Sequence, residues 1–142
     1  MGVKNGVAHT EFIVDPKGNP YFLELGARIP GAHLDILVRE ASGVDIAVEQ
    51  CRLEVCALTD SDYKVPQASF EQAGIVLCLS KDEHPDLSSF QDPEIVWRLA
   101  EDHHAGLLFK GKEERVEKLL HSYAERLQNE FLAVLPPSDK PA

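Results

Sequence analysis

The stretch HTEFIVDPKGNPYFLELGARIPG, residues 9–31, reads as two strands joined by a tight turn. Alternating runs on either side of the turn-forming residues DPKGNP are typical of an antiparallel β-hairpin. Each run also contains a carboxylate, Glu11 in the first and Glu24 in the second. A charged side chain inside an otherwise apolar strand needs water, a hydrogen-bond partner or a cation.

The two glutamates are expected to face each other across the hairpin. If residues 16–19 form a four-residue loop, Asp15 pairs with Pro20, and Glu11 then lies opposite Glu24. In the same register His9 lies opposite Gly26, and residue 7 opposite residue 28. Two facing carboxylates repel each other, which a shared proton, the nearby Arg28 or a bound metal would relieve.

Two interpretations of this face stand side by side. Paired carboxylates suit one or two Mg²⁺ ions, which take oxygen ligands and keep waters and phosphates in their shell. Alternatively, the glutamates lie on the solvent-exposed face of an ordinary antiparallel sheet. An EF-hand loop starting at Asp15 is excluded, because Lys17, Pro20 and Gly26 occupy its third, sixth and twelfth positions.

The rest of the chain mixes helices and strands without regular βαβ alternation, which predicts an α+β fold with an antiparallel sheet and packed helices. We expect helices over 34–41, ending near Gly43, and over 45–57, and strands over 72–80, 94–100 and 105–111. A long amphipathic helix is expected over 112–135, with its apolar stripe on Val116, Leu119, Leu120, Tyr123, Leu127 and Phe131. We predict one domain over 1–135 and a disordered tail over 136–142.

Composition excludes several classes of protein. The net charge of -10 over 142 residues disfavours binding to nucleic acid or to an anionic membrane. The longest apolar run, residues 73–79, is far shorter than a membrane span. Three cysteines without a CxxC pair predict buried, reduced thiols in a cytoplasmic protein.

Residues 5–50 resemble the metal-binding hairpin of ATP-grasp carboxylate–amine ligases, the group that includes biotin carboxylase-like enzymes and L-amino-acid ligases. The positions that match the family pattern are Gly6, Glu11, Glu24, Arg28, Gly31, Gly43 and Asp45. Residues 103–127 are similar in layout to the family's closing strand and last helix.

The resemblance implies roles for three side chains. Glu11 and Glu24 would hold Mg²⁺ or Mn²⁺ against the phosphates of ATP. Arg28 would bind nucleotide and act catalytically, contacting the transferring phosphate or the substrate carboxylate, unless it only neutralises the glutamates. His9 and His33 are weaker candidates for orienting a substrate. Gly26 departs from the pattern, because it stands where the family usually has an asparagine as a third metal ligand.

The sequence therefore predicts the metal- and ATP-phosphate-binding C-terminal part of a ligase that joins a small carboxylate to an amine or thiol through an acyl phosphate. The family's nucleotide-gripping N-terminal lobe would precede the hairpin, so we expect the chain to be inactive alone and to self-associate through uncovered apolar surface. One alternative is a non-catalytic binding or assembly module that keeps the fold. A short enzyme that is active by itself is the third.

Overall fold

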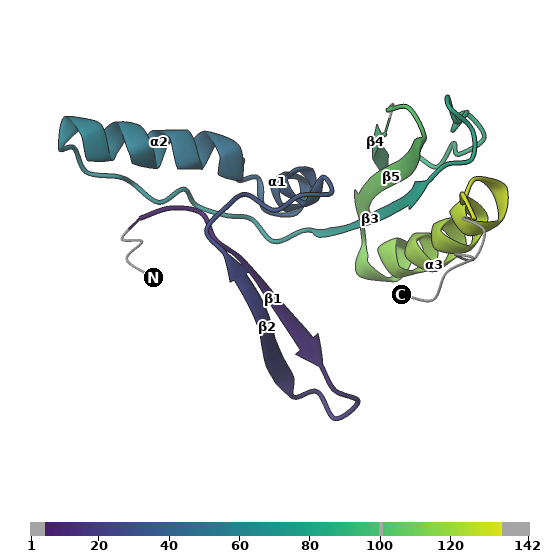
Figure 1. Cartoon of the computed structure of the whole chain (residues 1–142), viewed down its shortest axis with the longest axis horizontal. Helices are drawn as coiled ribbons and strands as arrows, with labels where there is room; N and C mark the ends of the chain where they lie inside the picture. Colours follow the sequence, from purple (N-terminus) through teal and green to yellow (C-terminus); the bar gives the residue numbers. More distant parts are fainter. Residues whose placement is uncertain (1–4, 100, 135–142) are drawn as a thin grey trace, which may run out of the picture. The chain divides into compact units, whose positions relative to one another are not determined.

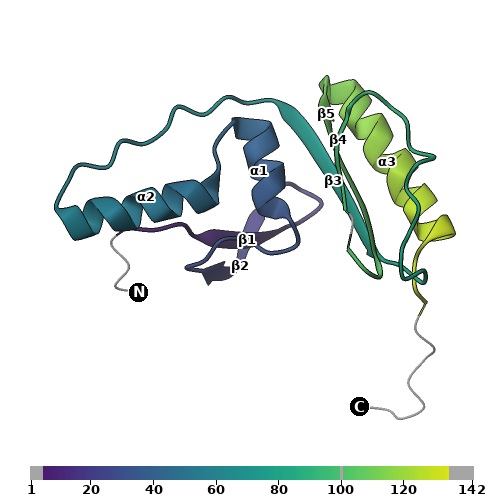
Figure 2. The ribbon, with the colours of Figure 1, turned by 90° about the horizontal axis from the view of Figure 1, so that it is seen from above.

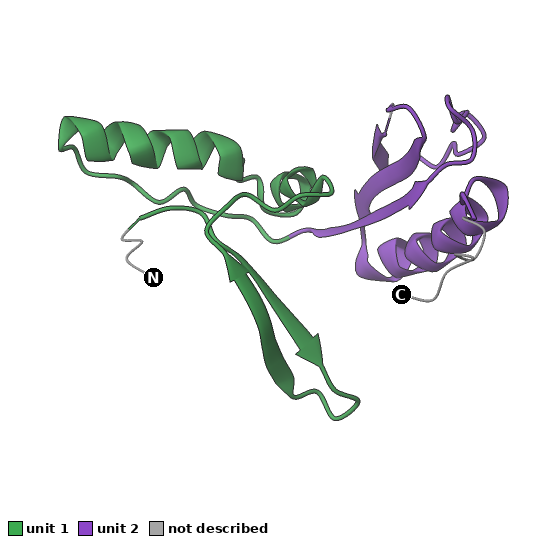
Figure 3. Ribbon diagram, in the orientation of Figure 1, with its two compact units in different colours: residues 1–70 green, residues 71–142 purple. Residues whose placement is uncertain are grey.

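The computed structural model describes residues 5–99 and 101–134 and has an α+β fold, as the sequence predicts (Figures 1 and 2). Its elements separate into two compact units, residues 1–70 and residues 71–142 (Figure 3). The expectation of one domain over 1–135 stays a prediction, and the expected tail over 136–142 lies outside the described residues. No helix in the described part of the chain is long and apolar enough to cross a membrane.

Unit 1 begins with the predicted hairpin, β1 (His9–Val14) paired antiparallel with β2 (Pro20–Gly26). Two helices follow, α1 (Leu34–Ser42) and α2 (Ile46–Thr59). Gly43 ends α1 as predicted, with a left-handed φ of 73° and its N–H bonded to the carbonyl oxygen of Arg39 at 2.8 Å. Asp45 caps α2 by accepting hydrogen bonds from the backbone N–H groups of Ala47 and Val48.

Unit 1 has little apolar core of its own. None of the described side chains of α1 is buried, and Glu49 is the buried residue of α2. Its carboxylate accepts hydrogen bonds from Arg52 at 2.6 Å and from the hydroxyl of Tyr63 at 2.7 Å. Within the described part of unit 1, no Cα atom of β1 or β2 lies within 8 Å of a Cα atom of α1 or α2.

Unit 2 is a three-stranded antiparallel sheet covered by one helix. The strands β3 (Gln72–Leu79), β4 (Ile95–Arg98) and β5 (His104–Gly111) lie in the order β3-β5-β4, so β5 is central. The helix α3 (Glu113–Glu130) packs on β3 and β5. The buried apolar side chains of the described chain all belong to this unit, from Val76 in β3 to Phe131 after α3.

The predicted stripe of α3 is confirmed at five of its positions, since Val116, Leu119, Tyr123, Leu127 and Phe131 are buried. The sixth, Leu120, is 38% exposed. The helix ends earlier than predicted, because the chain leaves it to pair with the end of β3. The carbonyl of Phe131 accepts from the N–H of Lys81, and the N–H of Ala133 donates to Leu79, both at 2.8 Å.

Candidate functional site

The turn of the hairpin is one residue shorter than predicted. Asp15 and Asn19 are joined by a backbone hydrogen bond of 3.1 Å, so the loop is residues 16–18 and not 16–19. Gly18, the third residue of the loop, has a left-handed φ of 86°, as is usual at this position of a three-residue hairpin loop. The Asp15 carboxylate accepts from the backbone of Lys17 and Asn19, and the bonds from Asn19 are the main reason that the pKa of Asp15 is lowered.

Glu11 nevertheless lies opposite Glu24, as predicted. A register shift between Glu11 and Phe12 restores the pairing that the shorter loop would have displaced. On the turn side of this shift Phe12 pairs with Phe22, which makes Leu23 the extra residue of a β-bulge. The facing carboxylates therefore depend on two compensating features, a short loop and a bulge.

The bulge leaves the two faces of the hairpin with different chemistry. Paired residues share a face, and residues two apart on a strand share it as well. One face carries His9, Glu11, Ile13, Tyr21, Glu24 and Gly26, and we call it the glutamate face. The opposite face, which we call the apolar face, carries no charged residue and consists of Thr10, Phe12, Val14, Pro20, Phe22 and Leu25.

His9 lies next to Glu11 on the glutamate face. Its Nδ1 atom is 3.6 Å from the Oε1 atom of Glu11, and its side chain is 22% exposed. The predicted pairing of His9 with Gly26 is confirmed. The predicted pairing of residue 7 with residue 28 is wrong, because β1 begins at His9 and the N–H of Val7 instead donates to the side chain of Gln50.

Arg28 lies beside Gly26. A Cβ atom on Gly26 would come within 3.3 Å of both the Cγ and the Nε of Arg28. Because Gly26 lies two residues from Glu24 in the same strand, that Cβ would point to the glutamate face. The Arg28 side chain thus extends over this face. Within the described residues its guanidinium makes one hydrogen bond, 3.3 Å from Nη1 to the carbonyl oxygen of Ile29, and no ion pair joins it to Glu11 or Glu24.

His33 lies at the start of α1 with a left-handed φ of 57°, directly after Ala32 at 53°. Two successive non-glycine residues in this region cost roughly 1–2 kcal/mol each. Strain of this kind often marks a functional loop. Nothing in the described geometry tests a role for His33 in orienting a substrate, which stays a prediction.

The residues on the glutamate face fit a hard divalent cation. Glu11 and Glu24 supply two carboxylates from adjacent strands, and the glutamate face holds no sulfur ligand that would favour a soft metal. In the described part of the chain no group of three or more His, Cys, Asp or Glu side chains is placed to hold a metal. An ion bound here would therefore take its remaining ligands from water and from an anion, as Mg²⁺ commonly does.

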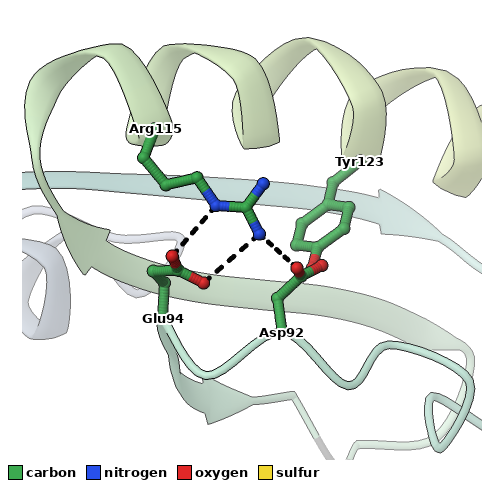
Figure 4. Close-up of polar contacts among 4 residues, drawn as sticks. All are labelled: Asp92, Glu94, Arg115 and Tyr123. Atoms are coloured by element: carbon green, nitrogen blue, oxygen red, sulfur yellow. Dashed lines mark hydrogen bonds and ion pairs between the residues drawn. The ribbon is translucent and has the colours of Figure 1, made fainter.

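Unit 2 contains a polar cluster that sequence reasoning did not identify (Figure 4). Arg115 of α3 donates from Nε to Glu94 at 2.9 Å and from Nη2 to Asp92. Asp92 also accepts a hydrogen bond from the hydroxyl of Tyr123. This bond, helped by Arg115, lowers the pKa of Asp92, while burial and then Asp92 raise the pKa of Tyr123. The cluster ties α3 to the segment before β4, and its one guanidinium is shared between two carboxylates.

The cysteines are free, as predicted, but they are not buried. Cys51 is exposed, and Cys56 and Cys78 are partly exposed. Cys51 and Cys56 border an open hollow of about 500 Å³ beside α2, which is also lined by Val48 and Val55. The expectation of burial was wrong for Cys51 because α2 carries apolar residues without a covering layer in unit 1.

Over 76 residues, 53% of this chain, the sequence is 36% identical to pyruvate carboxylase 1 of Caenorhabditis elegans, of which the match covers 6% of the length. The chain is thus similar over about half its length to a small part of a carboxylase. No family model matches the chain. No solved structure matches it either.

Proposed function

We propose that the chain is the metal- and ATP-phosphate-binding C-terminal part of an ATP-dependent carboxylate–amine or carboxylate–thiol ligase of the ATP-grasp type. The observation that supports this most directly is the position of Glu11 opposite Glu24, maintained by the bulge at Leu23. The similarity to a pyruvate carboxylase supports the same class of enzyme. The substrate acid and the nucleophile are left open.

In this proposal Glu11 and Glu24 hold Mg²⁺ or Mn²⁺. The ion, when bound, would neutralise charge on the ATP phosphates during transfer to the carboxylate. The glutamates fix its place because each comes from a strand and their separation is set by the ladder. Arg28 extends over the same face and would bind the phosphate or the substrate carboxylate with its planar fork of donors.

The apolar face of the hairpin would be covered by another protein surface. Phe12 and Phe22 pack edge to face at 6.1 Å, yet they are 56% and 63% exposed. A two-stranded hairpin with an uncovered apolar face is marginally stable in water. We propose that the nucleotide-gripping lobe of the ligase, or in its absence a second copy of the chain, covers this face.

A non-catalytic binding or assembly module is the second candidate. Gly26 favours it, because glycine supplies no third metal ligand where the family usually has asparagine. The two interpretations differ in whether the glutamate face binds a metal together with a nucleotide.

The test is a calorimetric titration of Mn²⁺, alone and with ADP or ATP, into the chain and into Glu24→Ala. We expect measurable binding that weakens by about tenfold or more in the variant, or about 1.4 kcal/mol, since one of two anionic ligands is lost. Glu117→Ala is the matched control, because it removes the same charge from an exposed position on α3.

Equal losses in Glu24→Ala and Glu117→Ala would show that only overall charge matters. Absence of binding in the unmodified chain would contradict the metal–phosphate site and favour the non-catalytic module. Mn²⁺ binding without any effect of ADP or ATP would also contradict it.

A further inference from the structure

Gly26 occupies a position where its backbone does not require glycine. Its φ lies outside the left-handed region, unlike that of Gly18 or Gly43. Glycine inside a strand is unfavourable, since it loses more entropy on folding and has no side chain to pack. The backbone conformation therefore does not explain a glycine here, but the neighbouring side-chain atoms do.

The space beside Gly26 is filled by Arg28. A Cβ at position 26 would contact the Cγ and Nε atoms of Arg28 at 3.3 Å and its Cδ at 3.7 Å. Contacts of 3.3 Å between a Cβ and its neighbours are tighter than most, so the exposed Arg28 side chain would have to move by a few tenths of an ångström. The Nε atom belongs to the guanidinium itself, and any shift at this point also moves the donors beyond it.

We infer that Gly26 is a positioning residue, whose missing side chain lets Arg28 lie across the glutamate face and present its guanidinium as the oxyanion-binding group beside Glu11 and Glu24. This inference rests on the proposed function, because it concerns the anion that accompanies the metal. Arg28 keeps most of its five donors for such a ligand, since one hydrogen bond, to Ile29, is made within the described residues.

The position of Gly26 bears on how the glutamate face accommodates both the two carboxylates and the Arg28 guanidinium. Position 26 pairs with His9, and the next pair on this face is Glu11 with Glu24. A side chain at 26 would take up space against Arg28 on the face that carries the carboxylates. In this inference a metal at the glutamates and an oxyanion at Arg28 would share one face, which suits a metal-bound phosphate or carboxylate.

A double-mutant cycle tests the inference in the full chain. Binding of ADP in the presence of saturating Mn²⁺ is measured for the unmodified chain, Gly26→Ala, Arg28→Gln and the double variant. We expect Gly26→Ala to weaken ADP binding by about threefold, less than Arg28→Gln, because a displaced guanidinium keeps its charge but loses hydrogen-bond geometry. In the Arg28→Gln background, Gly26→Ala should have no further effect.

Mn²⁺ binding alone separates this inference from the proposed function. Gly26→Ala should leave it within about twofold of the unmodified chain, because both glutamates remain. Gly31→Ala is the matched control, since a Cβ there meets nothing within 4 Å. Inorganic pyrophosphate and acetate replace ADP in two further arms, to show whether the guanidinium prefers a phosphate or a carboxylate.

A failure of Mn²⁺ to bind the unmodified chain would overturn the proposed function. Glu24-dependent Mn²⁺ binding with unchanged ADP affinity in Gly26→Ala would overturn the positioning role alone. Additive losses in the double variant would also overturn it, because Gly26 would then act independently of Arg28. Alanine is a better strand residue than glycine, so unfolding does not explain a loss, and amide exchange in β1 and β2 verifies that the hairpin is intact.

Discussion

Arg115 and Arg28 differ in how many of their guanidinium donors are already bonded within the protein. Arg115 has its guanidinium on Glu94 and Asp92, so its charge is used to hold α3 in place. Arg28 has one hydrogen bond, to the carbonyl of the next residue, among the described contacts. The same residue type is thus a structural tie in unit 2 and a candidate ligand-binding group in unit 1.

Tyr123→Phe tests the structural tie. The hydroxyl donates to Asp92 and is the main cause of the lowered pKa of Asp92. A carboxyl with a depressed folded-state pKa stabilises the fold above its unfolded value, about pH 4, and this contribution is lost as the pH falls through the folded pKa. We expect the variant to be less stable by about 1 kcal/mol at pH 7, with a smaller difference at pH 3.

Urea unfolding followed by the fluorescence of Trp97, the chain's one tryptophan, measures this difference in unit 2. Tyr21→Phe is the matched control, because its hydroxyl lies 3.4 Å from Asp15 in an exposed turn. A destabilisation that is the same at both pH values would argue that the hydroxyl acts through packing and not through the Asp92 carboxylate.

At the scale of elements, the hairpin was predictable and its irregularity was not. Turn-forming residues at 15–20 and the alternation around Glu11 and Glu24 specify two strands. The glutamates face each other as predicted only because the bulge offsets a loop that is one residue shorter than predicted. The bulge at Leu23 lies within the apolar run Tyr21–Phe22–Leu23. Because these three residues do not alternate with polar ones, the sequence does not show which of them is the extra residue. The contact of Arg28 with Gly26 was also not predictable, because it depends on the side-chain rotamer at the end of the strand. The early end of α3 was not predictable because it arises from tertiary pairing with the end of β3.

Gly18→Ala tests the short loop that replaced the predicted one. Gly18 has a φ of 86°, and a Cβ added there would meet nothing within 4 Å, so a methyl group costs backbone strain and no clash. We expect the hairpin to lose about 1–2 kcal/mol. Amide hydrogen exchange in β1 and β2 should quicken accordingly, by about tenfold.

Gly31→Ala is the comparison, because its Cβ also meets open space while its φ is not left-handed. This change should leave exchange in the hairpin unaltered. Similar exchange in Gly18→Ala and in the unmodified chain would mean that the turn relaxes to another type and does not need the left-handed residue.

At the scale of the whole molecule, the two units differ in how much of their apolar surface is buried. The buried apolar side chains of the described chain lie in unit 2, whereas those of the hairpin are exposed, with Val14 at 61% and Leu23 at 54%. Sequence patterning predicts which residues are apolar but not whether a covering layer exists. This is why the strands were predictable from the pattern, whereas uncovered apolar surface was expected from the family resemblance and not from the pattern.

Self-association is the property expected from that exposed surface. Each phenylalanine buried in a contact contributes roughly 1.5–3 kcal/mol, and the apolar face carries no charge that would oppose contact between two copies. The net charge of -10 repels copies elsewhere, so association should strengthen as salt screens this repulsion. Sedimentation velocity at several concentrations, at low and high salt, measures both effects.

The double variant Phe12→Ser/Phe22→Ser should shift the chain toward monomer, because it removes the aromatic pair from the centre of the apolar face. Leu58→Ser/Phe70→Ser is the matched control, since these side chains are 86% and 97% exposed and lie outside the hairpin. An equal shift in both variants would assign association to apolar surface in general. A chain that sediments as a monomer under all conditions would mean that the hairpin tolerates its exposure, which would remove the argument that another surface covers it.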